Sequence, residues 1–456
     1  MGPWPLWPAQ FSLYPGYFCV KTMTHPLAES LDFSGLPIQL AAIGLVLVLS
    51  IVIDRYALRV GIPGALALFG VGVAIQPLTR TAFDHRRFED LHVIALCLLL
   101  FYSGVKICRR YFNRKEFLIP SLLLSVVGVF IVIGVGGALM YAGLGTLVPG
   151  FLAGPQPLLI ALALVYCMAP QDWGAFSFIV KRVDRFSERI RGILEFETAI
   201  SAAITLVVGQ ALFEFFTEEA TSTMTSNAVN VFVSSVSEGI VIGGILGYLL
   251  SLTIQRFAVE RAQSIDLAIG FVMIGYGFNA WIGQGGLICS LVMGFVVSIL
   301  LSNKENEDEK DMLSVQLESI NIASETLIFF MAGLAVDLRI GFAPAFLAGL
   351  LLLLVVWMLR PLMVLIFFRK TDFLDHSERQ FLASWEPKGA ISMALAIAIP
   401  DLIEKTGIAF ERIINPVSEA FITDTVCFAV VMSMLIKSLL LPPLHRYLIE
   451  SKTLPG

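Results

Sequence analysis

Long apolar runs recur along the chain from Ile38 to Leu444, and short polar linkers separate them. A helix that crosses a bilayer needs about 20 consecutive, mostly apolar residues, and the runs have about that length. The pattern predicts thirteen transmembrane helices, at residues 37–54, 60–77, 90–107, 118–142, 156–179, 194–216, 230–254, 264–282, 286–302, 319–340, 342–368, 380–403 and 419–444. We therefore expect an all-α polytopic membrane protein, with a non-membrane segment at 1–36, a transmembrane domain at 37–444 and a tail at 445–456.

The composition narrows the possible functions. The 456 residues are 57% hydrophobic and only 15% charged, a balance typical of membrane proteins. The apolar runs leave no room for a soluble catalytic domain, so we do not expect an enzyme or a bound cofactor. No basic block is long enough to follow a phosphate backbone, which argues against nucleic-acid binding. The six cysteines are scattered without a CxxC pair, and we interpret them as packing residues.

The distribution of lysine and arginine predicts the orientation of the chain. Loops after odd-numbered helices, together with the tail, carry 21 of the 31 basic residues, whereas the opposite side carries 7 and the spans carry 3. Because cytoplasmic loops hold the excess of positive charge, we expect the amino terminus outside and the carboxyl terminus in the cytoplasm of a cell (inner) membrane. The acidic run 303–311 (NKENEDEKD) is interpreted as a solvated hinge, with a regulatory site as the alternative.

Two predicted spans are interrupted near their midpoints by a proline and a charge. The fifth contains Pro170 followed by Asp172, and the twelfth contains Pro387 followed directly by Lys388. In the predicted topology these spans run in opposite directions. Two crossed, broken helices are the arrangement that inverted-repeat transporters use to build a substrate site at the membrane midplane. Either break alone could be a simple proline kink, but the matched pair favours a site.

Further polar and charged residues lie within the predicted spans. Glu197 on the sixth span is a candidate site residue, although a carboxylate near a helix start can also serve as a cap. Thr198 and Ser201 could bind an ion or hydrogen-bond back to their own helix. Arg360 needs a carboxylate partner or a water-filled cavity, either for a structural ion pair or for transport. Lys437 is expected to reach the headgroups outside the site.

Several segments together resemble the sodium/hydrogen exchanger membrane domain of the monovalent cation:proton antiporter superfamily. The resemblance covers nearly the whole transmembrane domain. The segments that carry it are LLLFYSGVKI at 98–107, APQDWG at 169–174, GQGGLICSLVMG at 283–294, FMAGL at 330–334 and WEPKGAIS at 385–392.

The departures from the family pattern fall on the ion site. The family carries an Asn-Asp or Asp-Asp pair on the sixth helix, in a segment that the stretch 196–203 (FETAISAA) resembles, but Ser201 and Ala202 occupy those positions here. Tyr102 replaces a glutamate, Gln171 replaces a threonine, and Lys388 replaces an arginine. The usual ion-binding aspartate is therefore missing.

The resemblance implies a secondary transporter that exchanges protons for Na⁺ or K⁺ by alternating access. Asp172 would then be the titrating carboxylate, with Gln171, Thr198 and Ser201 as oxygen ligands. Glu197, Lys388 and Arg360 would form a supporting charge network. The expected partners are membrane lipids, the transported ions and a second copy in a homodimer. Two alternatives follow from Ala202: an exchange-inactive scaffold or sensor, or a transporter of another solute.

Overall fold

A computed structural model describes most of the transmembrane part of the chain. The described residues are 44, 46, 48–53, 55–57, 59, 62–79, 85–107, 115–148, 151–153, 157–180, 187–216, 224–257, 261–282, 285–301, 307–337, 342–369, 373–405 and 419–450. All regular structure in these residues is helical. The predicted segment 1–36 and residues 451–456 of the predicted tail lie outside them.

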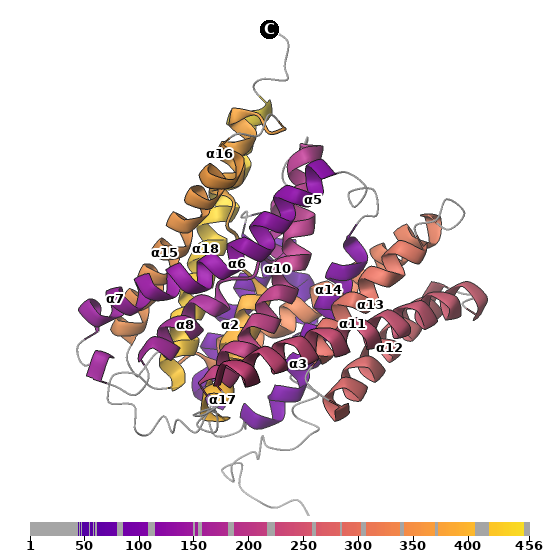
Figure 1. The fold of residues 1–456 in the computed structure, drawn as a ribbon, viewed down its shortest axis with the longest axis horizontal. Helices are drawn as coiled ribbons and strands as arrows, with labels where there is room; N and C mark the ends of the chain where they lie inside the picture. The colour runs from indigo at the N-terminus through magenta and orange to yellow at the C-terminus, as the bar shows by residue number, and fades with distance from the viewer. Residues whose placement is uncertain are drawn as a thin grey trace, which may run out of the picture.

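The helices are numbered as in Figure 1. Their bounds are α2 Gly64–Thr79, α3 His85–Lys106, α5 Lys115–Leu122, α6 Gly128–Ile131, α7 Gly137–Leu147, α8 Pro157–Cys167, α9 Trp173–Val180, α10 Glu188–Phe215, α11 Met224–Phe257, α12 Arg261–Ile282, α13 Gly286–Leu301, α14 Glu307–Ala335, α15 Phe342–Phe368, α16 His376–Ser384, α17 Ala390–Lys405 and α18 Glu419–His445. Helices α5 to α7 belong to one continuous helical run, Phe117–Leu147.

Each predicted span contains helix in the described residues, which confirms the predicted fold class. Within the described ranges, six helices are long and apolar enough to cross a membrane, and five shorter apolar helices accompany them. The fifth and twelfth spans are each divided in two, into α8 and α9 and into α16 and α17. In Figure 1, α16 lies at the top of the bundle, whereas α17 and α8 lie in its lower half.

Several helix starts differ from the predicted ones, most of all the start of α14. Helix α10 begins at Glu188 and not at residue 194, and α14 begins at Glu307 and not at residue 319. The hinge prediction for 303–311 is therefore wrong for residues 307–311, because they form the first turns of α14; residues 303–306 lie outside the described part. A run rich in Glu and Asp is compatible with the start of a helix, because negatively charged residues are favoured at that end.

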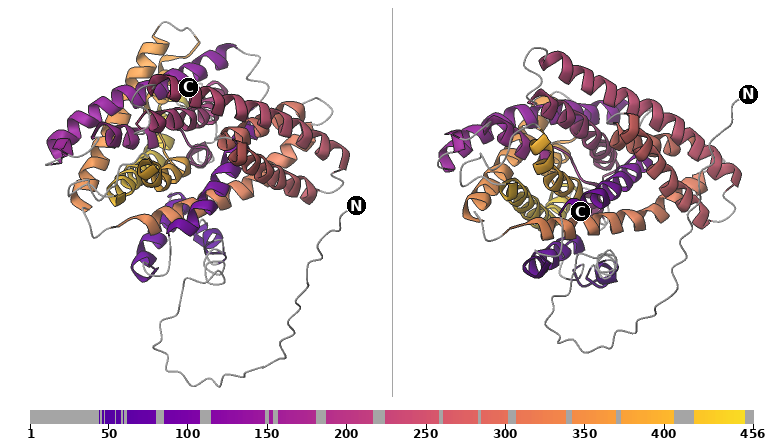
Figure 2. Two further views of the ribbon diagram at one scale, coloured as in Figure 1. Left: turned by 60° about the horizontal axis from the view of Figure 1, so that its bottom comes forward. Right: turned by 90° about the horizontal axis from the view of Figure 1, so that it is seen from below.

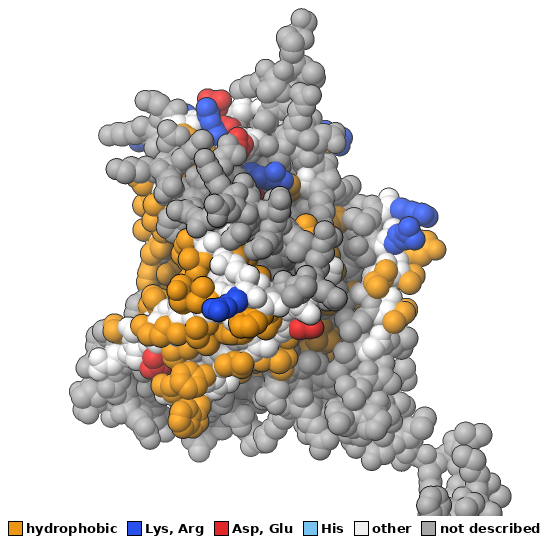
Figure 3. All heavy atoms as spheres, turned by 90° about the vertical axis from the view of Figure 1, so that its right-hand side faces the viewer, with side chains coloured by type: hydrophobic (Ala, Val, Ile, Leu, Met, Phe, Trp, Pro, Cys, Tyr) orange, Lys and Arg blue, Asp and Glu red, His pale blue; other side chains and the backbone are white. Residues whose placement is uncertain are grey.

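The interior and the surface of the bundle divide as expected for a membrane protein. Large apolar side chains such as Leu365 and Met358 on α15 and Ile245 on α11 are more than half exposed, as suits contact with lipid. Hydrophobic side chains cover much of the described surface in the middle of one face (Figure 3). The further views show the described helices packed into one assembly (Figure 2). Its buried core includes many residues of α8, α15, α17 and α18.

Candidate functional site

The backbone leaves the helical path at both prolines. Helix α8 ends at Cys167 and α9 begins at Trp173, so Pro170 lies in the gap. Helix α16 ends at Ser384 and α17 begins at Ala390, so Pro387 lies in the second gap. Proline has no N–H and disfavours helical backbone at the preceding residue, which accounts for both interruptions. The predicted break in each span is confirmed.

Asp172 joins the two breaks. Its Oδ1 accepts a hydrogen bond of 3.0 Å from the backbone N–H of Ala175 on α9, and its Oδ2 accepts one of 3.1 Å from the N–H of Ile391 on α17. The side chain is buried, with 1% exposure. One carboxylate therefore caps the first turns of two half-helices, whose positive dipole ends meet there. Gly389 is required at this point, because a Cβ there would lie 2.5 Å from Asp172 Oδ1.

Lys388 lies at the other kind of helix end in the crossing, where carbonyl groups point out of the end of α8. Its Nζ donates a 3.2 Å hydrogen bond to the carbonyl oxygen of Pro170, just beyond α8. Its ion-pair partner is Glu386, at 2.5 Å. The ammonium is thus directed to Glu386 and to the end of α8, where carbonyl groups favour positive charge, and not to Asp172.

Arg360 has the carboxylate partner that its position demanded. Its Nη1 and Nη2 donate to the two carboxylate oxygens of Glu197, the Nη2 bond being 2.8 Å long. Its Nε donates to the carbonyl oxygen of Leu382 on α16 at 3.2 Å and lies 3.7 Å from Glu386 Oε2. The alternative of a helix cap for Glu197 is wrong, because α10 begins at Glu188 and the carboxylate is used by Arg360.

The structure adds two residues to the predicted set. Glu386 binds both Lys388 and Arg360, and its signal in the sequence was a second charge, beside Lys388, in the segment 385–392. Lys437 does not reach the headgroups. It is 6% exposed, donates to the carbonyl oxygen of Ser384 at 2.8 Å and lies 4.2 Å from the ring centre of Trp357. The expectation that Lys437 snorkels was wrong because the end of α16 offers a nearer acceptor.

The three predicted oxygen ligands do not behave alike. Ser201 Oγ accepts a 3.1 Å hydrogen bond from the backbone N–H of Gln171 and donates to the carbonyl oxygen of Thr198 at 3.3 Å. Thr198 Oγ1 donates to Leu194 in its own helix at 2.7 Å. Gln171 Oε1 is buried and has no hydrogen-bond partner among the described residues. Both hydroxyl groups therefore donate to carbonyl oxygens of α10, and Ser201 in addition accepts the Gln171 N–H, which brings these two residues together at the break.

Position 202 contributes no charge to this arrangement. Ala202 is completely buried and belongs to the same hydrophobic core as Ala390 and Ile391 of α17. The place at which the family pattern has an aspartate is therefore occupied by packed apolar atoms.

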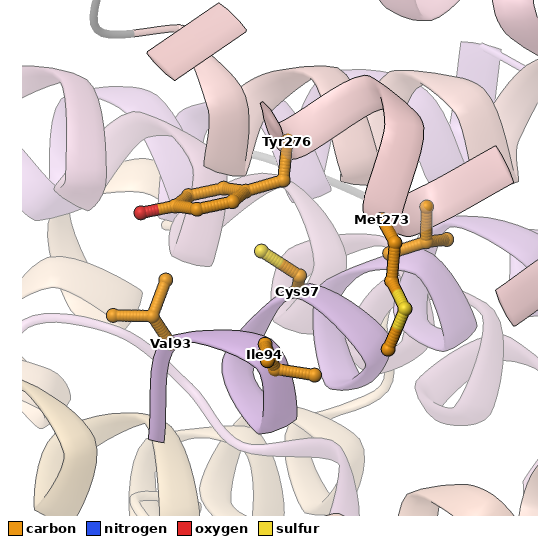
Figure 4. A pocket seen from close by; sticks show the side chains of 6 residues that line it. Val93, Ile94, Cys97, Met273 and Tyr276 are labelled. Atoms are coloured by element: carbon orange, nitrogen blue, oxygen red, sulfur yellow. The ribbon is translucent and has the colours of Figure 1, made fainter. Parts of the chain in front are cut away.

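A cavity of about 310 Å³ lies between α3 and α12, apart from the two breaks. Its lining residues are Val93, Ile94, Cys97, Val272, Met273 and Tyr276, and Figure 4 shows the Tyr276 ring on one side of it, across from Val93 and Cys97. This lining is mostly hydrocarbon, which lacks the oxygen ligands that a hard cation prefers. The four described cysteines, Cys97 among them, are free and buried, as the packing interpretation predicts.

Comparison with known proteins places this arrangement in context. Residues 43–447 match the family described as "Sodium/hydrogen exchanger, transmembrane". The chain is 24% identical over 356 residues to the Na(+)/H(+) antiporter ApNhaP of Aphanothece halophytica, covering 74% of this chain and 63% of that protein. It is 24% identical over 242 residues to the probable Na(+)/H(+) antiporter 2 of Methanocaldococcus jannaschii, covering 50% of this chain and 57% of that protein.

The fold has a counterpart among solved structures. The structure of the sodium proton antiporter MjNhaP1 from Methanocaldococcus jannaschii at pH 8 superposes with a TM-score of 0.75 and 18% identity, covering 91% of this chain and 99% of that one. A second structure of MjNhaP1 gives a TM-score of 0.73 at 18% identity, covering 92% of this chain and 100% of that one. At this identity the likeness supports the fold alone.

Proposed function

Because the chain belongs to the sodium/hydrogen exchanger transmembrane family, we propose that it exchanges protons for a monovalent cation, Na⁺ or K⁺, by alternating access. The observation that carries this proposal is the unequal pairing of charges at the crossing. Glu197 and Glu386 are held by Arg360 and Lys388, whereas no Lys, Arg or His side chain pairs with Asp172 among the described residues. Asp172 is therefore the carboxylate at the crossing that can take up a mobile cation.

Exchange follows from competition for this one carboxylate. A proton and a metal cation cannot both neutralise Asp172, so one leaves when the other binds. Hard cations prefer oxygen ligands. Gln171 Oε1 in the break and Ser201 Oγ on α10, which accepts the Gln171 N–H, are further candidates. The half-helices α9 and α17 both start at this carboxylate. A movement of either half-helix would therefore change the surroundings of the bound ion, as alternating access requires.

The orientation and the assembly belong to the same proposal. The excess of basic residues favours the α16 end of the bundle as the cytoplasmic end, with the amino terminus outside. We assign the protein to a cell membrane as a homodimer of multi-pass subunits. The chain spans 63% and 57% of the lengths of the two curated relatives it matches, so their activity is proposed for this chain by family membership and by the arrangement around Asp172.

The test is a transport assay on the full chain reconstituted into liposomes. An imposed pH gradient should collapse on addition of Na⁺ or K⁺ with the wild-type protein, and Asp172→Asn should abolish the response. Glu195→Gln is the matched control, because Glu195 forms an i,i+4 pair with Arg191 within α10. Size-exclusion chromatography would show that both variants fold. Undiminished exchange by Asp172→Asn would disprove the assignment of Asp172.

The packed Ala202 favours a second candidate, an exchange-inactive member of the family that serves as a scaffold or sensor. The same assay decides between the two. Wild-type liposomes that show no response to Na⁺, K⁺ or Li⁺ across a wide pH range would support the inactive protein and overturn exchange.

A further inference from the structure

Glu325 on α14 reaches the first turn of α9. A side-chain carbon added at Gly174 would collide with both carboxylate oxygens of Glu325 and with the carbon atom that joins them. Gly174 is the second residue of α9 and follows Asp172 by two positions. The carboxylate of Glu325 therefore lies against the backbone of the same half-helix that Asp172 caps, in space that only glycine leaves open.

The same side of α14 carries two further oxygen-bearing residues. Glu318 and Asn321 precede Glu325 by seven and four positions, a spacing that places all three on one face of a helix. Asn321 is 3% exposed, and its Oδ1 has no hydrogen-bond partner among the described residues. A buried carbonyl oxygen without a partner is costly, and a bound cation is one group that would satisfy it.

The facing helix, α3, shows that this place accommodates positive charge. The Nζ of Lys106 lies 5.2 Å from the ring centre of Tyr102 and 5.9 Å from that of Trp173, and the two rings are in edge contact at 6.2 Å. Helix α14 packs against α3, which brings its acidic face, with Glu318 and Glu325, toward Tyr102. An ammonium, two aromatic rings and the Glu325 carboxylate thus lie beside the start of α9.

We propose that Glu325, together with Asn321, forms a second binding position for the transported monovalent cation, adjacent to Asp172, and that it supplies the second carboxylate that position 202 lacks. This inference rests on the proposed exchange function. Intramembrane carboxylates are functional candidates by default, because they are costly to bury. Glu325 meets that expectation with a defined neighbour, the backbone of α9, and with a buried amide oxygen one turn away.

The arrangement gives the cation a route to the crossing. Glu318, Asn321 and Glu325 follow one another at about one turn each, roughly 5 Å of rise per turn, and the last of them lies beside the first turn of α9. In the proposed orientation, α14 starts in the cytoplasm. A cation would therefore pass from Glu318 to Asn321 and Glu325 before it reaches Asp172. While no cation is bound, the Lys106 ammonium would balance the negative charge of this face of α14.

The direct test compares Glu325→Gln with Glu195→Gln in liposomes. Both changes remove one carboxylate and keep the side-chain length. We expect Glu325→Gln to raise the half-saturating Na⁺ concentration by about tenfold, equivalent to about 1.4 kcal/mol, and Glu195→Gln to leave it unchanged. Glu325→Asp should fall between the wild type and Glu325→Gln. A sodium-induced rise in thermal stability of the detergent-purified protein should weaken in the same order.

A steric variant tests the same contact without removing the carboxylate. Gly174→Ala should impair exchange, because the new methyl group occupies the position of the Glu325 carboxylate. The shorter side chain of Glu325→Asp should relieve this collision, so the double variant Gly174→Ala/Glu325→Asp should transport better than Gly174→Ala alone. This pair remains decisive if Glu325→Gln fails to fold.

The possible results separate this inference from the proposed function. Absence of exchange by the wild-type protein would overturn both. Exchange that depends on Asp172 but has the same half-saturating Na⁺ concentration in Glu325→Gln and Glu195→Gln would overturn the second position alone. A loss of activity in Gly174→Ala that Glu325→Asp does not relieve would also overturn it.

Discussion

In the helix crossing, the two helix ends and the two helix starts differ in how their charges are balanced. At the ends of α8 and α16, carbonyl oxygens receive Lys388, Arg360 and Lys437, and these cations are paired with or lie near two carboxylates. At the starts of α9 and α17, backbone N–H groups receive Asp172 alone. At the helix ends, the compensated side, positive and negative side chains balance each other within the protein. At the helix starts, the uncompensated side, a carboxylate has no cationic partner among the described residues. We infer that the first side holds the crossing together and the second does the exchange.

Breaking the compensated side should have the largest effect on stability. Arg360→Met would leave Glu197 buried without its bidentate partner, and removal of one member of a buried ion pair costs about 3–5 kcal/mol. We expect a large loss of unfolding free energy in detergent, measured by denaturant titration, and little folded protein for transport assays.

The double variant Glu197→Leu/Arg360→Met is the control for this prediction. Replacing both partners with apolar residues is often nearly neutral, so the double variant should recover much of the stability that Arg360→Met loses. Equal destabilisation of the single and double variants would show that the pair itself does not hold the crossing.

The two helix breaks could be predicted from the sequence, whereas most of the ion-pair partners at the crossing could not. A proline beside a charge inside an apolar run is visible without a structure, and so was the need of Arg360 for a carboxylate. The partner of Lys388 was not visible, because Glu386 and Asp172 were both within reach and only the three-dimensional path of the break selects between them. Glu325 was missed because its neighbour, Gly174, comes from a helix some 150 positions away, and no local sequence pattern reports such a packing contact.

Crowding the uncompensated side should reduce transport more than stability. Gly389→Ala would place a methyl group 2.5 Å from Asp172 Oδ1, so the carboxylate or the start of α17 must move. We expect exchange to fall by about tenfold, since small displacements of a binding group have effects of this size or larger, while most of the protein stays folded.

Gly244→Ala is the matched control for Gly389→Ala, because a Cβ at Gly244 on α11 would have no atom within 4 Å. Transport rates of the two variants, normalised to the amount of folded protein in the liposomes, would be compared with wild type. Equal rates in all three proteins would mean that the contact of α17 with Asp172 is not part of the transport cycle.

The smallest expected effect separates two hydroxyl groups on α10. Ser201 faces the break and accepts the Gln171 N–H, whereas Thr198 bonds to its own helix. Ser201→Ala should raise the half-saturating cation concentration by about threefold, because a neutral hydrogen bond contributes about 0.5–1.5 kcal/mol, and Thr198→Ala should leave it unchanged. A larger increase for Thr198→Ala than for Ser201→Ala would show that Ser201 only connects the break to α10. The cation would then be bound on the side of Thr198 and not beside Gln171.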